Sequence, residues 1–471
     1  MIRIFSAVHR LVWGVPVLVL ILGVGIFLTV RLGFVQVKLF PAALKRFCAG
    51  FLPGKAVSEE SSSFRALCTA LGATVGTGNL VGVAGAICIG GPGAVFWMWL
   101  CGFLGMAVKF AETILAIHFR IKTGDGYAGG PMYVITRGLG EKFRPMAYLY
   151  SLFGLLAAFG VGNAAQINAV IGGINGILAQ SGVVQTPERD LLIGAVLAVL
   201  VGLVLLGGAG RIGAAAELLV PFAALGYILL CTGVLFACRQ KLPLALLHIF
   251  QGAWDPKSVT GGALGSAFVA LRVGCSRGIF TNEAGMGTAS IAHAGARVAH
   301  PVEQGLMGMV EVFLDTIVIC TLTALVILVS DVPIPYGMDK GSTLATSAFS
   351  CVYGKLAPVL IGLILCALAV ATLFGWGLYG ARCAQFLFGS GAWKWFAAAQ
   401  MLMVLAASAM DTAFIWQISE IFNGLMAIPN LITLAALSRE AVRLTKEYKK
   451  SGASVAGGGR YYADFHQCKP L

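Results

Sequence analysis

The chain reads GATVGTGN at residues 72–79 and GCSRGIFTNEAG at residues 274–285, and both stretches lie inside apolar segments long enough to cross a bilayer. Backbone at membrane depth leaves helical geometry only where it is buried in protein or lines a cavity. Close helix packing through small residues is the alternative explanation for either stretch alone. Because there are two such stretches, we expect two broken membrane helices that border a binding cavity.

The composition around these stretches is that of an integral membrane protein. Of the 471 residues, 58% are hydrophobic and only 11% are charged, whereas a soluble domain carries roughly 25% charged residues. These values exclude a soluble enzyme, a disordered scaffold and a secreted disulfide protein. The 12 cysteines and six histidines are scattered without metal-binding spacing.

Eleven apolar stretches are long enough to span a membrane, and they lie near residues 11–35, 66–90, 93–119, 145–180, 190–208, 214–238, 262–296, 304–330, 354–388, 392–410 and 413–437. The first is too long for a signal peptide and lacks a small-residue cleavage site. The sequence therefore predicts an all-α polytopic protein with 11 transmembrane helices and with its termini on opposite sides of the membrane.

Basic residues predict the orientation of these helices. Most of the 33 Lys and Arg residues fall on one side, and loop 239–257 is the one segment that fits this assignment poorly. The positive-inside rule then places the N-terminus outside and the C-terminus in the cytoplasm, in the plasma (cell inner) membrane. We expect the net charge of +13 to attract anionic membrane lipid. No nucleic-acid partner is expected, because the charges are spread over short loops.

An internal repeat relates the two glycine-rich stretches. Residues 79–114 align without gaps to residues 282–317, with ten of 36 positions identical. Five predicted spans separate the copies, so the second copy is inverted in the membrane. The prediction is a 5+5 inverted repeat, which is a transporter architecture. Its segments are an N-terminal helix and cytoplasmic loop (1–65), a first repeat (66–238), a second repeat (239–437) and a basic cytoplasmic tail (438–471).

Paired helix breaks predict a site for opposite charges. Freed amides at a half-helix N-terminus attract a carboxylate, and freed carbonyls coordinate a cation, so a zwitterionic amino acid with Na⁺ satisfies both. Asn79 and Asn282 add amide oxygens at matching repeat positions, with a helix–helix hydrogen bond as the alternative role. Asn163 and Gln166 share one helix face, where they either contact the substrate or form structural hydrogen bonds.

Several charged residues fall within the predicted spans or at their ends, and intramembrane charges are costly. They are Glu112, Glu217, Glu283, Glu311, Asp315, Glu420, Lys109, Arg272 and Arg277. One interpretation is that these residues form structural ion pairs or gates, for example Arg277 with Glu283. Direct coupling to a proton or cation is the other. The candidate gating or coupling residues are Glu112, Arg277, Glu283 and Asp315.

Several motifs resemble the alanine or glycine:cation symporter family, also called the sodium:alanine symporters. The most specific is GGPGAVFWMW at residues 90–99, followed by KFAE at 109–112. Further matches are GPMY at 130–133, residues 277–287, HPVEQGL at 300–306 and FGW at 374–376. The resemblance extends from about residue 11 to residue 437. Departures from the family pattern are Gly102, Gly377, Leu378 and Ala381.

The resemblance implies a leucine-transporter-like fold preceded by one extra N-terminal helix. It also implies Na⁺-driven uptake of small neutral amino acids such as alanine and glycine. The substrate carboxylate would lie near the amides of Thr77 and Gly78, and a sodium ion would take the carbonyls of Gly72 and Val75 with the hydroxyl of Thr372. Side-chain pocket residues implied by the resemblance are Gly278, Ile279, Phe280 and Trp376.

Sequence reasoning therefore predicts a symporter that works by alternating access, with Na⁺ as a co-transported ion and no cofactor. A proton-coupled carrier of the same fold is the first alternative, with Glu112 or Asp315 as the titrating acid. A channel fits less well, because no re-entrant filter or charged pore ring is visible. An intramembrane enzyme fits poorly, since no GxSxG or HExxH motif is present.

Overall fold

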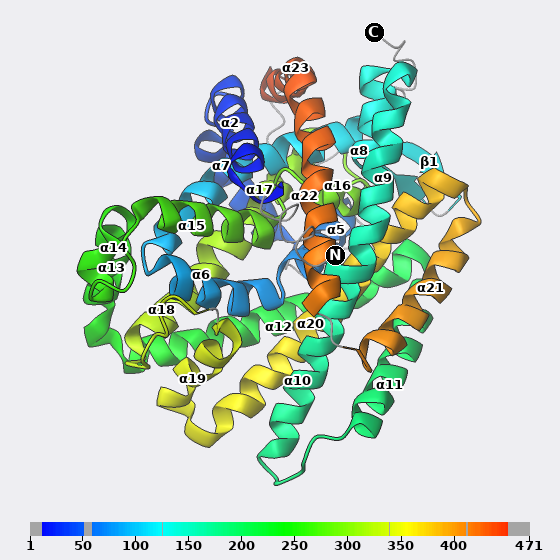
Figure 1. Ribbon diagram of the computed structural model, residues 1–471. Helices are drawn as coiled ribbons and strands as arrows, with labels where there is room; N and C mark the ends of the chain where they lie inside the picture. Colours follow the sequence, from blue (N-terminus) through cyan, green and yellow to red (C-terminus); the bar gives the residue numbers. More distant parts are fainter. Residues whose placement is uncertain (1–11, 51–58, 125, 339, 411–412, 451–471) are drawn as a thin grey trace.

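The computed structural model describes residues 12–50, 59–124, 126–338, 340–410 and 413–450, and it is built almost entirely of helices (Figure 1). Residues 1–11 at the start of the first expected span, residues 51–58 of the following loop and residues 451–471 of the basic tail lie outside the described residues. The α-helices are α2 (Val15–Arg31), α3 (Val35–Lys38), α4 (Phe40–Ala49), α5 (Glu59–Thr74), α6 (Val83–Gly90), α7 (Ala94–His118), α8 (Pro131–Val134), α9 (Arg144–Phe159), α10 (Ala165–Ala179), α11 (Pro187–Leu205), α12 (Gly208–Ala237), α13 (Leu242–Trp254), α14 (Pro256–Thr260), α15 (Ala267–Asn282), α16 (Thr288–His293), α17 (Pro301–Val312), α18 (Thr321–Val329), α19 (Gly341–Tyr353), α20 (Ala357–Phe388), α21 (Ala392–Ala407), α22 (Ala413–Ala436) and α23 (Ser438–Lys450).

Short π and 3₁₀ turns join or interrupt these helices. They are η1 (Gly78–Gly82), η2 (Ile135–Leu139), η3 (Glu141–Phe143), η4 (Gly160–Ala164), η5 (Arg239–Lys241), η6 (Phe313–Cys320) and η7 (Gly354–Leu356). An antiparallel hairpin, β1 (Ile121–Thr123) with β2 (Gly126–Ala128), lies in the loop after α7. The sequence did not predict this hairpin, in which the Arg120 guanidinium carbon stands 3.8 Å from the centre of the Tyr127 ring.

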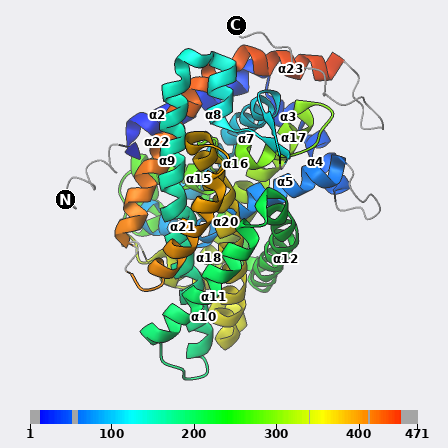
Figure 2. The same cartoon turned by 90° about the vertical axis from the view of Figure 1, so that its right-hand side faces the viewer.

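Helices occupy each of the stretches expected to cross the membrane. Among the described residues, six helices are long and apolar enough to span a bilayer, or seven if one bent pair counts as a span. Two further apolar helices, α2 and α21, are shorter. The count of eleven spans and the 5+5 repeat therefore stay predictions. Helices α10 and α11 extend together beyond the rest of the molecule in both views (Figures 1 and 2).

The helices at the centre of the bundle are buried, whereas helices at its periphery expose apolar side chains, as expected for a protein in lipid. Helix α7 lies at the centre and packs against α15 and α17. At the periphery, α12 leaves Leu218 79% exposed and Phe222 77% exposed. Exposed apolar side chains on a spanning helix are compatible with acyl chains and not with water. We therefore interpret this face of α12 as lipid-facing.

Both glycine-rich stretches contain a helix break, but the second break lies only at the end of its stretch. The first break follows Thr74, and the helical segments on its two sides are bent by 52°. In the second stretch α15 continues to Asn282, and the chain turns only at residues 283–287, where Glu283 and Gly285 have φ values of 53° and 95°. The break therefore occupies the C-terminal end of the expected range.

Gly274, at the start of the second stretch, serves close packing. A Cβ atom at this position would lie 2.2 Å from the Ala94 carbonyl oxygen on α7. The small-residue packing that was the alternative explanation thus applies to this part of the stretch. Glycine here admits a neighbouring backbone, while Gly285 permits a left-handed turn.

We predict that Gly274→Ala lowers the melting temperature of the detergent-solubilised protein, because overpacking against backbone costs about 1–3 kcal/mol. The matched control is Gly172→Ala in the interior of α10, where an added Cβ meets nothing within 4 Å. This control should melt at or above the wild-type temperature, since alanine favours a helix over glycine by about 1 kcal/mol. Equal melting of both variants and the wild type would contradict the packing role of Gly274.

Candidate functional site

The first helix break lies between Thr74 and Gly78 and is closed by Asn79. The Gly76 N–H donates to Asn79 Oδ1 at 2.9 Å, and the Asn79 N–H reaches the Gly76 carbonyl at 3.3 Å. One π-helical turn, η1, follows at once. Such turns in membrane helices are frequent at functional sites. The side chain of Asn79 thus satisfies a backbone donor that the break releases.

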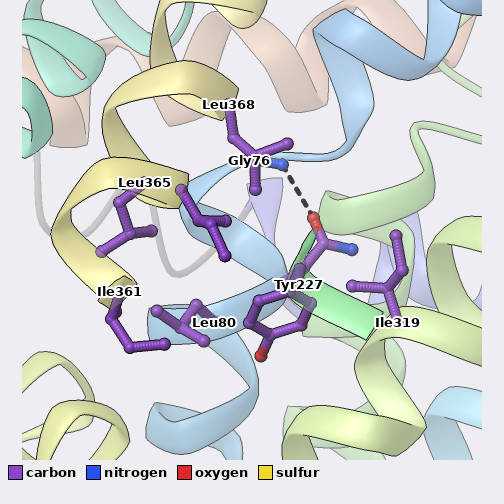
Figure 3. A pocket seen from close by; sticks show the side chains of 9 residues that line it. Gly76, Leu80, Tyr227, Ile319, Ile361, Leu365 and Leu368 are labelled. Atoms are coloured by element: carbon purple, nitrogen blue, oxygen red, sulfur yellow. Dashed lines mark hydrogen bonds between the residues drawn. The ribbon is translucent and has the colours of Figure 1, made fainter. Parts of the chain in front are cut away.

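A small hollow lies beside this break, and Figure 3 shows the Gly76–Asn79 bond at its edge. Its volume is about 10 Å³, and its other walls are mostly aliphatic side chains such as Leu80, Ile319 and Leu368. A space of this size holds at most about one water molecule. The hollow is therefore too small for an organic substrate.

Oxygen atoms gather on the α20 side of the break. The Thr372 hydroxyl donates to the Gly72 carbonyl at 2.9 Å and also lies 3.0 Å from the Leu368 carbonyl. Glycine is required nearby, because a Cβ on Gly76 would lie 2.9 Å from Thr372 Oγ1. Val75, which directly precedes Gly76, is also buried. Thus the structure brings Gly72, Gly76 and Thr372 together, with neutral oxygens that suit a hard cation.

A cavity of about 320 Å³ opens on the other side of the break. Its described lining residues are Thr77, Gly78, Val81, Gly82, Ala165, Ala169, Arg277 and Phe280. This volume is at the small end of the usual range for ligand sites. Three of the predicted substrate residues, Thr77, Gly78 and Phe280, therefore share one cavity with Arg277, a predicted coupling residue.

Three other predicted substrate residues occupy packed positions near the cavity. Asn163 is fully buried and donates to the Gln400 carbonyl at 3.3 Å. Gln166 is buried close to the first break, with Oε1 3.9 Å from the position of a Cβ on Gly76. Trp376 is 1% exposed and packs closely against η4, which joins α9 to α10. A Cβ atom added to Gly162 in this turn would lie 2.3 Å from the Trp376 Cβ.

The remaining two predicted pocket residues face α7. A Cβ on Gly278 would lie 3.2 Å from Met98 Cα, and Ile279 is 2% exposed in the core beside α7. Among the residues that the structure describes around the cavity, Phe280 is the member of the 278–280 run that lines it. Helical geometry causes this difference, because successive residues of α15 point about 100° apart.

The second break is held by a carboxylate from α7. The Gly285 N–H donates to Glu112 Oε1 at 2.9 Å, and Asn430 Nδ2 of α22 donates to the same oxygen at 2.7 Å. Asn430 Nδ2 also bonds the Gly285 carbonyl at 2.9 Å. Asn282 Oδ1 accepts the Ala284 N–H at 2.9 Å. One freed amide of this turn is thus satisfied by the distant side chain of Glu112, and another by the neighbouring side chain of Asn282.

Asp315 contacts the first break indirectly, through the side chain of Asn79. Asn79 Nδ2 donates to Asp315 Oδ1 at 2.6 Å, and the Thr316 hydroxyl donates to Asp315 Oδ2 at 2.9 Å. Asn282 Nδ2 in turn donates to Thr316 Oγ1 at 3.0 Å. Glu112 and Asp315 are equivalent positions of the aligned repeat. Each acid therefore contacts a residue at the break in the opposite half of the chain.

Arg277 and Glu283 lie in different surroundings, although the sequence suggested them as a pair. Arg277 Nη1 stands 3.9 Å from Glu420 Oε1. Glu283 Oε2 accepts the Thr288 hydroxyl at 2.5 Å, across the second break. Arg277 therefore faces α22 at the cavity, and Glu283 ties the start of α16 to the turn that precedes it.

A buried polar chain runs from α7 toward the start of α5. Lys109 Nζ lies 3.3 Å from Glu311 Oε1, and His293 Nε2 lies 2.7 Å from Glu311 Oε2. Gln304 Nε2 then contacts His293 Nδ1 at 2.8 Å, and the Ser63 hydroxyl donates to Gln304 Oε1 at 2.5 Å. All five side chains are at most 1% exposed. Because each charge here has a partner, this chain ties four helices together.

Sequence reasoning missed several residues of the site. Val81, Gly82, Ala165 and Ala169 line the cavity, and Asn430 binds the second break. Ala165 and Ala169 are four residues apart and so share one helix face, which is a detectable signal. Small apolar residues are common in this chain, however, and that signal does not separate them from packing positions.

Comparison with known proteins identifies the family of the chain. Residues 1–456 match the sodium:alanine symporter family. The chain is 39% identical to the sodium/alanine symporter AgcS of Methanococcus maripaludis, over 95% of this chain and 97% of that protein. It is also 35% identical to the amino-acid carrier protein AlsT of Bacillus subtilis, over 92% of this chain and 89% of that protein.

The backbone is similar to that of MhsT in the crystal structure of its complex with L-phenylalanine. The TM-score is 0.57 at 13% sequence identity, and the match covers 81% of this chain and 97% of MhsT. This likeness supports the leucine-transporter-like fold expected from the sequence. The family match along nearly the whole chain, together with relatives that are 39% and 35% identical over more than nine tenths of it, shows that the chain belongs to the sodium:alanine symporter family.

Proposed function

We propose that this protein is a secondary active transporter that carries alanine or glycine into the cell together with Na⁺ by alternating access. The observation that carries the proposal is the first break. It presents Thr77 and Gly78 to a cavity on one side and the Gly72 carbonyl with the Thr372 hydroxyl on the other. Such a break offers sites for a carboxylate and a cation at the same depth. Membership of the symporter family supports transport by symport.

The cavity wall favours a short substrate side chain. Val81, Ala165, Ala169 and Phe280 provide an apolar surface around about 320 Å³. A hydrophobic pocket discriminates by size at roughly 1–3 kcal/mol per methylene. In the proposed binding mode the carboxylate meets the amides of Thr77 and Gly78, and a methyl group or hydrogen faces this wall.

The proposed sodium ligands are the carbonyls of Gly72 and Val75 and the hydroxyl of Thr372. In the described structure this hydroxyl donates to the Gly72 carbonyl at 2.9 Å, so its lone pairs face away from that bond. Asn79 and Asn282 are further candidates, since each amide oxygen has two lone pairs and accepts one backbone N–H. No cofactor enters this proposal.

The reciprocal contacts of Glu112 and Asp315 supply a basis for coupling. Each acid bonds a residue at the break in the opposite half, so a rotation of one half against the other would change both sets of bonds. The proposed frame for this motion is the 5+5 inverted repeat after one extra helix, in the plasma membrane with the N-terminus outside. One charge crossing 100 mV releases about 2.3 kcal/mol, enough to drive substantial accumulation.

We predict that purified protein in liposomes takes up labelled alanine when a Na⁺ gradient is applied, and that a K⁺ gradient of the same size gives no uptake above empty liposomes. Competition should weaken in the order glycine or alanine, then valine, then phenylalanine, because the cavity is small. Uptake that is equally fast with K⁺, or that prefers phenylalanine, would contradict the proposed substrate and ion.

Thr372→Val should raise the Na⁺ concentration for half-maximal uptake at least tenfold, because one oxygen ligand is replaced by a methyl group. Thr372→Ser should restore most of the Na⁺ affinity. Thr232→Val is the matched control, since Thr232 is exposed on α12 and, within the described part of the chain, its hydroxyl bonds the local carbonyl of Ile228 at 2.7 Å. An unchanged Na⁺ dependence in Thr372→Val would remove Thr372 from the ion site.

Proton coupling is the second candidate, and the buried carboxyl group of Asp315 beside the first break favours it. Under this alternative an inward proton gradient drives uptake without Na⁺, and Asp315→Asn abolishes that uptake. The proposed Na⁺ symport predicts instead no proton-driven uptake in the wild type. It also predicts a higher half-maximal Na⁺ concentration in Asp315→Asn, because the negative charge beside Asn79 is lost. Initial rates measured under the two gradients decide between them.

A further inference from the structure

A second cavity of about 320 Å³ adjoins the proposed substrate cavity. Arg277 and Phe280 line both spaces, and the second one is also lined by Trp13, Arg272, Ser276 and Glu420. Because the two cavities share these two side chains, Arg277 and Phe280 form the partition between them. A solute that passes directly between the two cavities would have to move past these side chains.

Trp13, directly before α2, touches the partition from the second cavity. Its indole Nε1 donates to the Glu420 carbonyl at 2.8 Å. Its ring stands edge-on to Phe280, with ring centres 6.3 Å apart and planes at 64°. Edge-to-face aromatic pairs contribute about 0.5–1.5 kcal/mol beyond the area that they bury. Glu420 is also the residue whose carboxylate lies beside Arg277. Thus one tryptophan contacts Phe280 directly and Arg277 through Glu420.

The sequence of α22 is adapted to this contact. Gly424 lies one turn beyond Glu420, and a Cβ at Gly424 would stand 2.4 Å from Val12 Cγ1 and 3.2 Å from Trp13 Nε1. Helix α2 packs against both α7 and α22, and the three helices are neighbours in Figures 1 and 2. The start of α2 is therefore held close to the cavity, although α2 precedes both predicted repeats.

We propose that the extra N-terminal helix serves as a brace for the access route, and that Trp13 is the positioning residue that holds Phe280 and Glu420 in the partition. This inference rests on the proposed function for its meaning in transport. Trp13 does not line the substrate cavity among the residues described around it, so it acts through Phe280 and Glu420. Loss of its ring removes the edge-to-face contact that holds Phe280 on the side of the second cavity. The substrate cavity then opens more easily and accepts larger side chains.

Transport kinetics of Trp13→Ala and Trp13→Phe test the brace. For Trp13→Ala we expect the KM for alanine to rise at least fivefold with kcat within twofold, and inhibition by leucine relative to glycine to strengthen at least threefold. Trp13→Phe keeps a ring beside Phe280 and loses the donor to Glu420, so it should restore the size preference. Trp395→Ala is the control, because Trp395 is 80% exposed on α21. A Trp13→Ala variant that matches Trp395→Ala in KM and in size preference overturns the proposal.

A second measurement does not depend on transport. Ala169→Cys places a thiol in the substrate cavity, and a small polar methanethiosulfonate reagent reports its accessibility in detergent-solubilised protein. Labelling of the chain without this cysteine is subtracted as background. Adding Trp13→Ala should speed modification at least fivefold, whereas adding Trp395→Ala should not change it. An equal rate with and without Trp13→Ala overturns the brace. A protein that fails to transport alanine with Na⁺ but shows faster labelling would overturn only the proposed function.

Discussion

Every part of this site depends on one constraint, which is that a backbone N–H or C=O released inside a membrane must find a partner within the protein. At the first break the Gly76 N–H is taken by Asn79 and the Gly72 carbonyl by Thr372. At the second break the Gly285 N–H is taken by Glu112. The side chains that make these bonds come from α20, from α7 and from η1, which follows the first break. Each break therefore requires these elements to lie beside it.

The same constraint explains where the buried acids lie. An isolated carboxylate in the bilayer is very costly, and Glu112 Oε1 and Asp315 Oδ1 each accept a hydrogen bond from a residue at a break, Gly285 and Asn79 respectively. Their repeat-related positions mean that each half of the chain supplies the acid for the other half. Direct hydrogen bonds therefore connect each acid to a residue at the break in the opposite half of the chain.

Sequence reasoning worked well where periodicity and composition carry the signal. These signals predicted a polytopic helical membrane protein, and motifs that resemble a known family predicted the family. Of the six substrate-binding residues that the resemblance implied, Thr77, Gly78 and Phe280 line one cavity. Sequence reasoning was less successful with glycine, because this residue serves two opposite purposes. Gly285 allows a left-handed turn, whereas Gly274 sits in an unbroken helix where a neighbouring carbonyl leaves no room for a side chain. The local sequence does not distinguish these two uses, because they differ in which atoms of other helices lie next to the glycine.

The sequence by itself indicated a chain that resides in a bilayer, because few of its residues are charged, and it predicted broken helices near residues 72–79 and 274–285, with close helix packing as the alternative. Only the tertiary structure decided which residues meet at those openings. Asn430 at the second break, Glu420 beside Arg277 and Trp13 against Phe280 are separated from their partners by more than a hundred positions. Such contacts are set by the way helices pack around α7, and no local pattern along the chain specifies them.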